Sequence, residues 1–423
     1  MQIEAARPWR WVPTLYFAQA VPYIVAMTVS VVMYKTLGIS NTDIALYTSW
    51  LYLPWVIKPL WSPLVDMFAT KRGWILAMQL AVGASLAMVA LTLPASHFFQ
   101  LSLAMLWLLA FASATHDIAA DGFYMLALEQ HRQAAFVGVR SAFFRVGMIG
   151  AQGGLVYLAG TLGDFTGDVT AAWSIVFGIA GAMFAILCAW HHFVLPAPAA
   201  DGPVAHEDFL RGFAASFASF FRRKDIGRIL AFLVLFRFAE AQALKLVTPF
   251  LLDPRDAGGL GLSTEDVGIV YGTLGVIALT TGGLLGGIAI ARGGLRRWLW
   301  PMVVAMHVPN LVFVYLAFAQ PASIVTICAA LAIEQFGYGF GFAAFLLYMV
   351  MVSDGPTRTS HYAICTGFMA LGMMLPGMAS GWLQEKLGYA SFFTWVCFAT
   401  IPSFLVAARV RVDPDFGARP RPA

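Results

Sequence analysis

Charged residues are scarce in this sequence, since Asp, Glu, Lys and Arg together make up 11% of its 423 residues. A soluble domain usually carries about 25%, because water must hydrate its surface. Apolar residues form continuous runs and do not alternate with polar ones, as they would in the strands of a lipid-facing barrel. The composition therefore excludes a soluble domain and a membrane barrel.

Cysteine is also rare, and the four cysteines form no CxxC or Cys/His spacing. We therefore expect no disulfide, no metal site and no cofactor. His97, His307 and His361 stand alone near the ends of apolar segments, where capping or interfacial roles are expected. No nucleophile with a nearby base and no repeated acidic filter is evident. An integral-membrane enzyme and an ion channel are therefore the less favoured alternatives.

The sequence is instead rich in apolar residues, which make up 60% of it. They form segments long enough to cross about 30 Å of hydrocarbon as helices, which satisfy their backbone hydrogen bonds internally. We expect an all-α membrane protein with twelve transmembrane helices. Their approximate ranges are 11–34, 43–65, 73–94, 98–124, 136–160, 171–194, 226–250, 266–290, 297–318, 322–351, 360–384 and 390–409.

Lysine and arginine indicate the orientation of these helices. Eighteen of the 26 basic residues fall in loops of one side, and three fall in loops of the other. Because basic loops stay in the cytoplasm, both termini are predicted to be cytoplasmic in a multi-pass protein of the bacterial inner membrane. This topology accounts for the net charge of +4. We expect the lipid bilayer, and not nucleic acid, as the surrounding partner.

Charged residues and prolines interrupt the apolar pattern between the sixth and seventh segments. They divide the chain into an N-terminal six-helix bundle (1–195), a cytoplasmic linker with an amphipathic helix (196–225) and a C-terminal six-helix bundle (226–423). Phenylalanines from Phe209 to Phe221 recur in the linker at helical spacing, which fits a helix on an anionic leaflet and also an ordinary linker helix. We favour the ordinary linker, and we expect a monomer.

Two loops at matching positions of the halves are alike. Residues 62–66 and 71–73 follow the second segment, and the glycine-rich, basic residues 286–297 follow the eighth. Both loops resemble the signature of the major facilitator superfamily, in which an acidic residue and basic partners latch the cytoplasmic side. Ala291 replaces the second-half acid. The resemblance implies the major facilitator fold with alternating access, and it implies gating roles for Asp66, Arg72, Arg292 and Arg297. We expect gating or structural roles for Lys58 and Arg140 as well, as salt-bridge partners of acids inside the segments.

Ionisable residues inside the apolar segments carry most of the functional information, because each costs roughly 3 kcal/mol at mid-bilayer. Such groups need a partner or a hydrated cavity. Bases and acids are nearly balanced, which suggests that many are paired across helices. The bases are Lys58, Arg140, Arg145, Arg237 and Lys245, and the acids are Asp117, Asp121, Glu240 and Glu334.

The four acids lie on the fourth, seventh and tenth segments. In the superfamily that this chain resembles, these helices and the first line the central cavity. The first segment carries Tyr16, Gln19 and Tyr23 on one face, at spacings of three and four. We expect these residues to outline one polar cavity for a small-molecule substrate.

Asp117 and Asp121 lie one turn apart near the cytoplasmic end of the fourth segment. They could repel each other and share a proton. Alternatively, they could accept salt bridges from Lys58 and from Arg140 or Arg145, which are expected at similar depth. We favour the salt bridges and keep both carboxylates as candidates for proton coupling.

Arg145 and Gln152 share a face of the fifth segment, where Arg145 would meet either a substrate carboxylate or an internal acid. On the seventh segment, Arg237 and Glu240 are three residues apart and can pair within the helix. Lys245 would lie nearer the outer side. All of these residues are candidates for the cavity.

Glu334 on the tenth segment has no basic residue within a turn. It stands beside glycines 337, 339 and 341, a stretch that we expect to be kinked and hydrated. Burial would suit this carboxyl to carry a proton, whereas an arginine from another helix would make it structural. It is our first candidate for the proton carrier, with Glu240 as a further one.

Longer motifs resemble one family in particular. They are residues 53–66, 114–121, 144–148, 237–240, 334–341 and 376–382. Over residues 11–405 the chain resembles the AmpG-like muropeptide permeases and their acetyl-coenzyme A transporter relatives, and siderophore importers are similar in the same regions. His116 stands where the AmpG-like family often has glutamine.

The resemblance implies proton-driven import of cell-wall fragments, namely anhydro-sugars with or without a peptide. Tyrosines would stack on sugar faces, and cations would meet peptide carboxylates. A siderophore or another amphiphilic metabolite is the alternative substrate. The residues concerned are the tyrosines Tyr16, Tyr23, Tyr124 and Tyr338 and the cations Arg145, Arg237 and Lys245.

Overall fold

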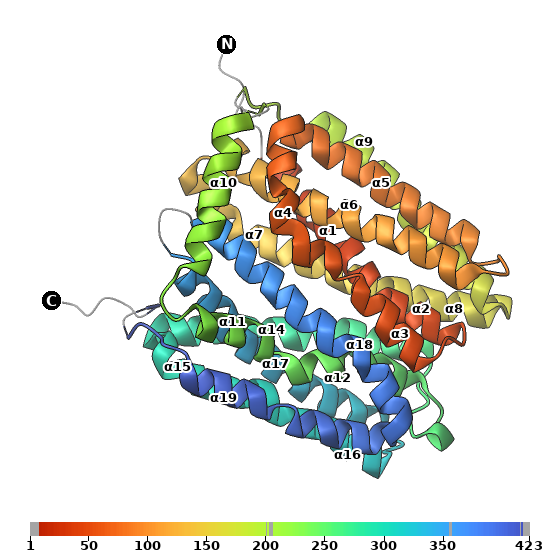
Figure 1. The fold of residues 1–423 in the computed structure, drawn as a ribbon. Coiled ribbons are helices and arrows are strands. Elements are labelled where there is room, and N and C mark those ends of the chain that lie inside the picture. The colour runs from red at the N-terminus through yellow and green to blue at the C-terminus, as the bar shows by residue number, and fades with distance from the viewer. Residues whose placement is uncertain (1–7, 200, 203–205, 355–357, 415, 418–423) are drawn as a thin grey trace. The chain divides into compact units, whose positions relative to one another are not determined.

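The computed structural model describes residues 8–199, 201–202, 206–354, 358–414 and 416–417. These residues form helices joined by short loops, with no strand among them (Figure 1). The expectation of an all-α protein is therefore confirmed. The chain divides into two compact units: unit 1 is Met1–Leu37 with Ile57–Gly212, and unit 2 is Gly38–Val56 with Phe213–Ala423.

Unit 1 is built from long helices, one of which, α5, packs against both α6 and α9, while α1 packs against α7 (Figure 1). Two π-helical segments, η2 and η3, extend α1 and α7 and also contact each other. The bounds are η1 Pro8–Arg10, α1 Val12–Ile24, η2 Val25–Val29, α2 Ser30–Thr36, α4 Leu53–Phe68, α5 Lys71–Thr92, α6 Phe98–Ala127, α7 Gln130–Met148, η3 Ile149–Leu155, α8 Val156–Thr166 and α9 Val169–Val194.

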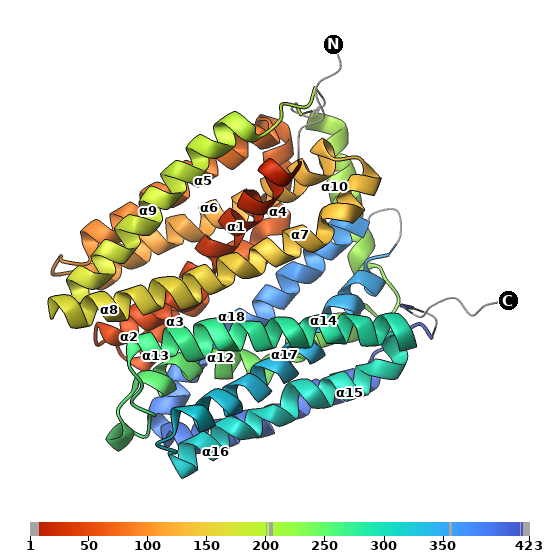
Figure 2. The ribbon, with the colours of Figure 1, turned by 180° about the vertical axis from the view of Figure 1, so that it is seen from behind.

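Unit 2 contains α17, which packs against α14 and α15 (Figure 2), and α18, which packs against α3 and α12. The bounds are α3 Asn41–Trp50, α10 His206–Phe221, α11 Ile226–Leu235, α12 Phe238–Leu252, η4 Arg255–Ala257, α13 Thr264–Val267, η5 Gly268–Gly275, α14 Val276–Gly293, α15 Leu295–His307, η6 Val308–Asn310, α16 Leu311–Ala319, α17 Ile324–Val352, α18 Arg358–Phe398 and α19 Ile401–Arg409.

Nine helical stretches among the described residues are long and apolar enough to cross a membrane. The second and seventh expected segments are not among them, because α3 and α4, and likewise α11 and α12, are separate shorter helices. The last two expected segments run together from Ser360 to Arg409, interrupted by the non-helical backbone of Gly388. All twelve expected segments are thus helical.

The two units do not follow the order of the sequence throughout. The halves separate between Gly212 and Phe213, inside the expected linker. Residues Gly38–Val56, however, cluster with the second half although they belong to the first half in sequence. The helix α3 is therefore a part of unit 2, which no sequence pattern had indicated.

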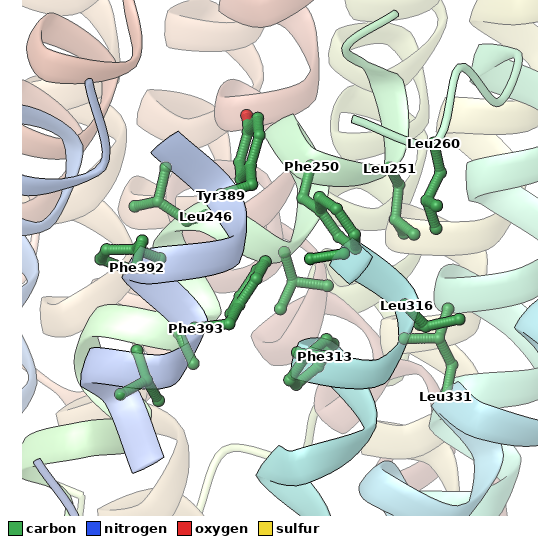
Figure 3. Packing of buried hydrophobic residues seen from close by; sticks show 14 of the residues in the cluster. Leu246, Phe250, Leu251, Leu260, Phe313, Leu316, Leu331, Tyr389, Phe392 and Phe393 are labelled. Atoms are coloured by element: carbon green, nitrogen blue, oxygen red, sulfur yellow. The ribbon is translucent and has the colours of Figure 1, made fainter. Parts of the chain in front are cut away.

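A cluster of buried apolar side chains fixes α12 in unit 2 (Figure 3). Phe250 of α12 meets Phe393 of α18 edge to face, with ring centroids 4.9 Å apart, and Phe393 stacks on Phe313 of α16 at 5.1 Å. Because closely packed apolar side chains resist movement of the helix that carries them, this cluster holds the polar residues of α12 in place.

Glycines bring α14 and α17 into backbone contact. A methyl group at Gly339 would overlap the carbonyl oxygen of Leu279, and one at Gly282 would overlap that of Phe336. Small residues allow this close approach between membrane helices. This result corrects the kink expected beside Glu334, because α17 is one continuous helix whose glycines fit its neighbours.

Candidate functional site

Arg140 of α7 is the centre of a polar group in unit 1. Its guanidinium forms a salt bridge with Asp121 of α6 at 3.0 Å and lies 4.5 Å from the ring centroid of Tyr16 and 5.5 Å from that of Tyr124. The Tyr16 hydroxyl also donates to Asp121, at 3.2 Å. The guanidinium therefore makes a cation–π contact with one face of each ring, and these contacts connect α1, α6 and α7.

The other carboxylate of α6, Asp117, pairs with Lys58 of α4 at 3.6 Å. Both acids of the fourth segment thus have the salt bridges that we favoured from the sequence. Arg145 donates to the sulfur of Met148 at 3.6 Å and has further contacts. Its expected role toward a substrate stays a prediction.

The neutral candidates of unit 1 lie on α1 and on the π-helix η3. Gln19 and Gln152 are buried, and Tyr23 is partly buried. The carbonyl oxygen Oε1 of Gln19 has no hydrogen-bond partner among the described residues. Because α1 contacts η3, and π-helical turns are frequent at functional sites, this region is the candidate substrate-facing part of unit 1.

A buried polar chain in unit 1 was missed by the sequence reasoning. Gln79 of α5 contacts His116 Nε2 at 3.1 Å and His191 Nδ1 at 3.0 Å, and His191 Nε2 lies 2.9 Å from the hydroxyl of Thr14. The chain links α1, α5, α6 and α9, with Gln79 and both histidines buried. A glutamine inside an apolar segment was the available signal, because a buried amide needs partners.

The gating candidates have different surroundings. The side chain of Asp66 lies outside the described residues, and Arg292 and Arg297 are exposed. The backbone N–H of Arg72 donates to the carboxylate of Asp201 at 3.0 Å, and that of Lys71 donates at 2.7 Å. Asp201, which the sequence reasoning missed, therefore caps the N-terminus of α5, where helix N–H groups favour an anion.

Arg237, the residue that precedes α12, and Glu240 in the first turn of α12 form the buried ion pair that their spacing predicted. The guanidinium donates to both carboxylate oxygens, with Nε at 3.0 Å from Oε2, and to the hydroxyl of Tyr338 at 2.8 Å. It also lies 4.7 Å from the ring centroid of Phe342. The bond from Arg237 to Tyr338 connects the start of α12 to α17, and the role of Glu240 in proton coupling stays a prediction.

Glu334 of α17 has neutral surroundings. Its side chain is buried, with 5% of the residue exposed, and Oε2 accepts from the amide of Gln335 at 2.8 Å. Among the described residues, no lysine or arginine forms a salt bridge with it. The surroundings of Glu334 therefore differ from those of Asp117, Asp121 and Glu240, each of which forms a salt bridge with a base.

Lys245 of α12 is also buried, with 4% of the residue exposed. Its Nζ donates to the hydroxyl oxygen of Thr48 on α3 at 2.9 Å and lies 5.3 Å from the ring centroid of Tyr52. Both contacts are made by residues of the segment 38–56. The sequence placed Lys245 in the cavity set but gave no indication of these partners.

A second set of contacts, which we call the Asn41 seam, binds the start of α3 to α18 and to the end of α12. The amide nitrogen of Asn41 donates to Gln384 at 2.8 Å and to Tyr389 at 2.9 Å, and Tyr389 donates to Asp253 at 2.6 Å. The backbone N–H and the hydroxyl of Thr42 donate to Glu385, at 3.0 and 2.6 Å. The seam residues are therefore Asn41, Thr42, Asp253, Gln384, Glu385 and Tyr389.

Glycine is required beside this seam. A methyl group at Gly381 of α18 would overlap the carbonyl oxygen of Asn41, and one at Gly377 would lie 2.7 Å from the hydroxyl of Ser49. The helices α3 and α18 therefore touch through backbone atoms, and their polar side chains meet at the end of that contact.

His361 is not isolated, contrary to the expectation from the sequence. Its Nδ1 lies 2.9 Å from a guanidinium nitrogen of Arg223, and its Nε2 lies 2.8 Å from the hydroxyl of Ser219 in α10. Because a guanidinium only donates, Nδ1 is the acceptor and Nε2 carries the hydrogen. These bonds attach the end of α10 to the start of α18.

Comparison with known proteins gives matches over almost the whole chain. A family model described as the Major Facilitator Superfamily matches residues 14–353. The anhydromuropeptide permease of Escherichia coli strain K12 is 26% identical over 385 residues, which cover 90% of this chain and 73% of that protein. A Rickettsia conorii protein named as transporter AmpG 4 is 23% identical over 401 residues, covering 89% and 91%.

Solved structures are similar as well. The nucleoside transporter NupG matches with a TM-score of 0.69 at 18% identity, and the match covers 96% of this chain and 99% of that one. At this identity the likeness concerns the fold alone.

Proposed function

This chain belongs to the Major Facilitator Superfamily, among its AmpG-like members, and we propose that it imports cell-wall muropeptides across the bacterial inner membrane together with protons. Membership makes it a multi-pass membrane transporter of small molecules and not an enzyme. The proposed substrate is an anhydro-sugar with or without a peptide. It is supported by the permease that is similar over 90% of the chain.

The observation that carries proton coupling is the environment of Glu334. This buried carboxyl contacts a neutral amide, and among the described residues it forms no salt bridge. Asp117, Asp121 and Glu240 each have a basic partner instead. A coupling group must gain and lose a proton during each cycle, which a permanent ion pair opposes. Glu334 is therefore the proposed proton carrier.

Alternating access is the proposed mechanism. We propose that the contact between residues 38–56 and the rest of unit 2 forms and breaks during the cycle. This segment joins unit 2 through the Asn41 seam, although residues on both sides of it in sequence belong to unit 1. When such a contact opens, water can replace the hydrogen bonds between its side chains, so the seam can break and re-form. Release of the seam would therefore free α3 from α18 in one state of the cycle.

The proposed topology has both termini in the cytoplasm, because basic residues concentrate in the loops of that side. The seam acids Asp253 and Glu385 would then lie near the outer surface, and Arg72 and Arg292 near the inner one. We also propose that one chain forms the complete transporter.

Uptake into proteoliposomes tests the proposed function. A labelled anhydromuropeptide should accumulate above its external concentration when the outside is made acidic, and a protonophore should abolish the accumulation. Vesicles without the protein are the control. Uptake that ignores the gradient would exclude proton coupling, and uptake of a siderophore in place of the muropeptide would exclude the proposed substrate.

A further inference from the structure

Lys245 differs in its surroundings from Arg237, the other buried cation among the described lysines and arginines. Its Nζ contacts the hydroxyl of Thr48 and the ring face of Tyr52, both of which are neutral. Within the described residues, no carboxylate forms a salt bridge with Lys245. By contrast, the structure gives a carboxylate partner to Lys58, Arg140 and Arg237.

The contact with Thr48 leaves Lys245 with capacity for another acceptor. The Thr48 hydroxyl donates its own hydrogen to the carbonyl oxygen of Ile44 at 2.6 Å, so it can only accept from Lys245. An ammonium has further N–H donors beyond the one used here. A charge of this kind, enclosed by apolar and neutral groups, is stabilised strongly by an anion that reaches it.

A second polar group lies close to the same place. Ser49 is fully buried, and its hydroxyl has no hydrogen-bond partner among the described residues. A methyl group at Gly377 would lie 2.7 Å from this hydroxyl and 3.4 Å from Cγ of Lys245. The aliphatic stem of Lys245 and the unpartnered Ser49 hydroxyl therefore flank one glycine, and the hydroxyl has a hydrogen to donate to an oxygen anion.

We propose that Lys245, with the hydroxyl of Ser49, binds a carboxylate of the transported molecule, so that the substrate must be an organic anion. This inference rests on the proposed function and specifies its substrate class. A sugar without a carboxylate would leave the ammonium without a counter-charge and would bind weakly. Arg237 is not equivalent to Lys245, because its guanidinium is already bound by Glu240.

Binding at Lys245 would also act on α3. Thr48 and Ser49 both lie on this helix, and the bond from Lys245 to Thr48 is one of the contacts between α3 and α12. A carboxylate that draws the ammonium toward itself would weaken that contact. Substrate occupancy would thereby influence whether residues 38–56 stay attached to unit 2.

The test compares acids with their esters. The purified full-length chain in lipid nanodiscs is titrated by calorimetry with an anhydromuropeptide, a short peptide and a sugar acid, each as the free acid and as the methyl ester. Lys245→Met removes the charge and keeps the length of the side chain, Lys245→Arg keeps the charge, and Lys224→Met, at an exposed lysine of unit 2, is the matched control.

The wild-type chain and Lys224→Met should bind the acid of the true substrate roughly 10- to 100-fold more tightly than its ester, the range for one charged hydrogen-bonded contact. Lys245→Met should bring the acid down to the affinity of the ester. Lys245→Arg should keep most of the preference. Ester binding by Lys245→Met also shows that this variant is folded.

Three results distinguish failure of the carboxylate site at Lys245 from failure of the proposed transport function. If the anhydromuropeptide ester binds as tightly as its acid, the inference is wrong while the proposed function stands. If another acid of the panel binds with the same dependence on Lys245, the inference stands and the muropeptide is wrong. If no acid binds more tightly than its ester, or if the preference survives in Lys245→Met, Lys245 is not a carboxylate receptor.

Discussion

Replacing Asn41 by alanine should release α3 from unit 2. The Asn41 amide is the centre of the Asn41 seam, because it donates to Gln384 and to Tyr389. Alanine removes both bonds and leaves the oxygen of Gln384 without this donor. The backbone contact at Gly381 remains, so the change is confined to the polar part of the seam.

The magnitude follows from the geometry of those bonds. Their lengths of 2.8 and 2.9 Å are those of good hydrogen bonds in a buried place. Losing two of them, with an acceptor left unsatisfied, costs about 2 to 3 kcal/mol. Since every 1.4 kcal/mol corresponds to about a tenfold change, the population with α3 released should rise about 30- to 150-fold.

Thiol labelling measures that population. Ser49→Cys places a thiol on α3 at a fully buried position, in a chain whose four native cysteines are replaced by alanine. Intact cells are treated from outside with a membrane-impermeant maleimide. The labelling rate follows the released fraction when opening and closing are fast. Asn41→Ala should therefore raise the rate by the factor given above.

A matched variant separates release from general destabilisation. Asn310→Ala removes an equally buried asparagine from η6, outside the seam, and should leave the labelling rate unchanged. Equal rates in Asn41→Ala and in its parent would refute the reasoning. Equal increases in both asparagine variants would show that the seam has no special part in holding α3.

The remaining predictions concern the proton carrier, the helix contact and the buried ion pair. Glu334→Gln should abolish gradient-driven accumulation in proteoliposomes while substrate counterflow continues; normal accumulation would dismiss this residue. Gly339→Val should lower the free energy of unfolding by about 1 to 3 kcal/mol, because α14 contacts it directly. Gly287→Val is the control, because a side chain at Gly287 of α14 meets open space, and it should leave the free energy of unfolding unchanged. Equal melting temperatures of the two variants would contradict this reasoning. Arg237→Met should destabilise the protein by about 3 to 5 kcal/mol, and Arg237→Met with Glu240→Gln should recover most of that loss in a thermal melt; no recovery would mean that the pair is not coupled.

Local pairs on one helix were predictable from spacing alone. Arg237 and Glu240 are three residues apart, at the start of α12, and they are paired in the structure as their spacing predicted. For the two carboxylates of α6, the sequence predicts basic partners on other helices but does not say which base pairs with which acid. The structure selects Lys58 for Asp117 and Arg140 for Asp121.

Non-local contacts were not predictable in this way. The chain from Thr14 through His191 and Gln79 to His116 joins four helices, and nothing in the spacing of these residues relates them. The sequence predicts a kink at the glycines beside Glu334, because glycine weakens a helix. Glycine also allows a neighbouring helix to approach closely, and the sequence pattern is the same in both cases. Only the positions of α14 and α15 show which of the two effects operates.

By itself, the sequence determined the helical fold class, the twelve membrane segments and the presence of buried ionisable groups on particular segments. Each of these depends on the hydropathy of residues close together in the chain, which burial in lipid converts directly into structure. Only the tertiary structure decided that residues 38–56 join unit 2 and that Lys245 and Glu334 face neutral partners. Which charges are matched depends on which helices approach within a few ångströms, and that is a property of packing between distant segments.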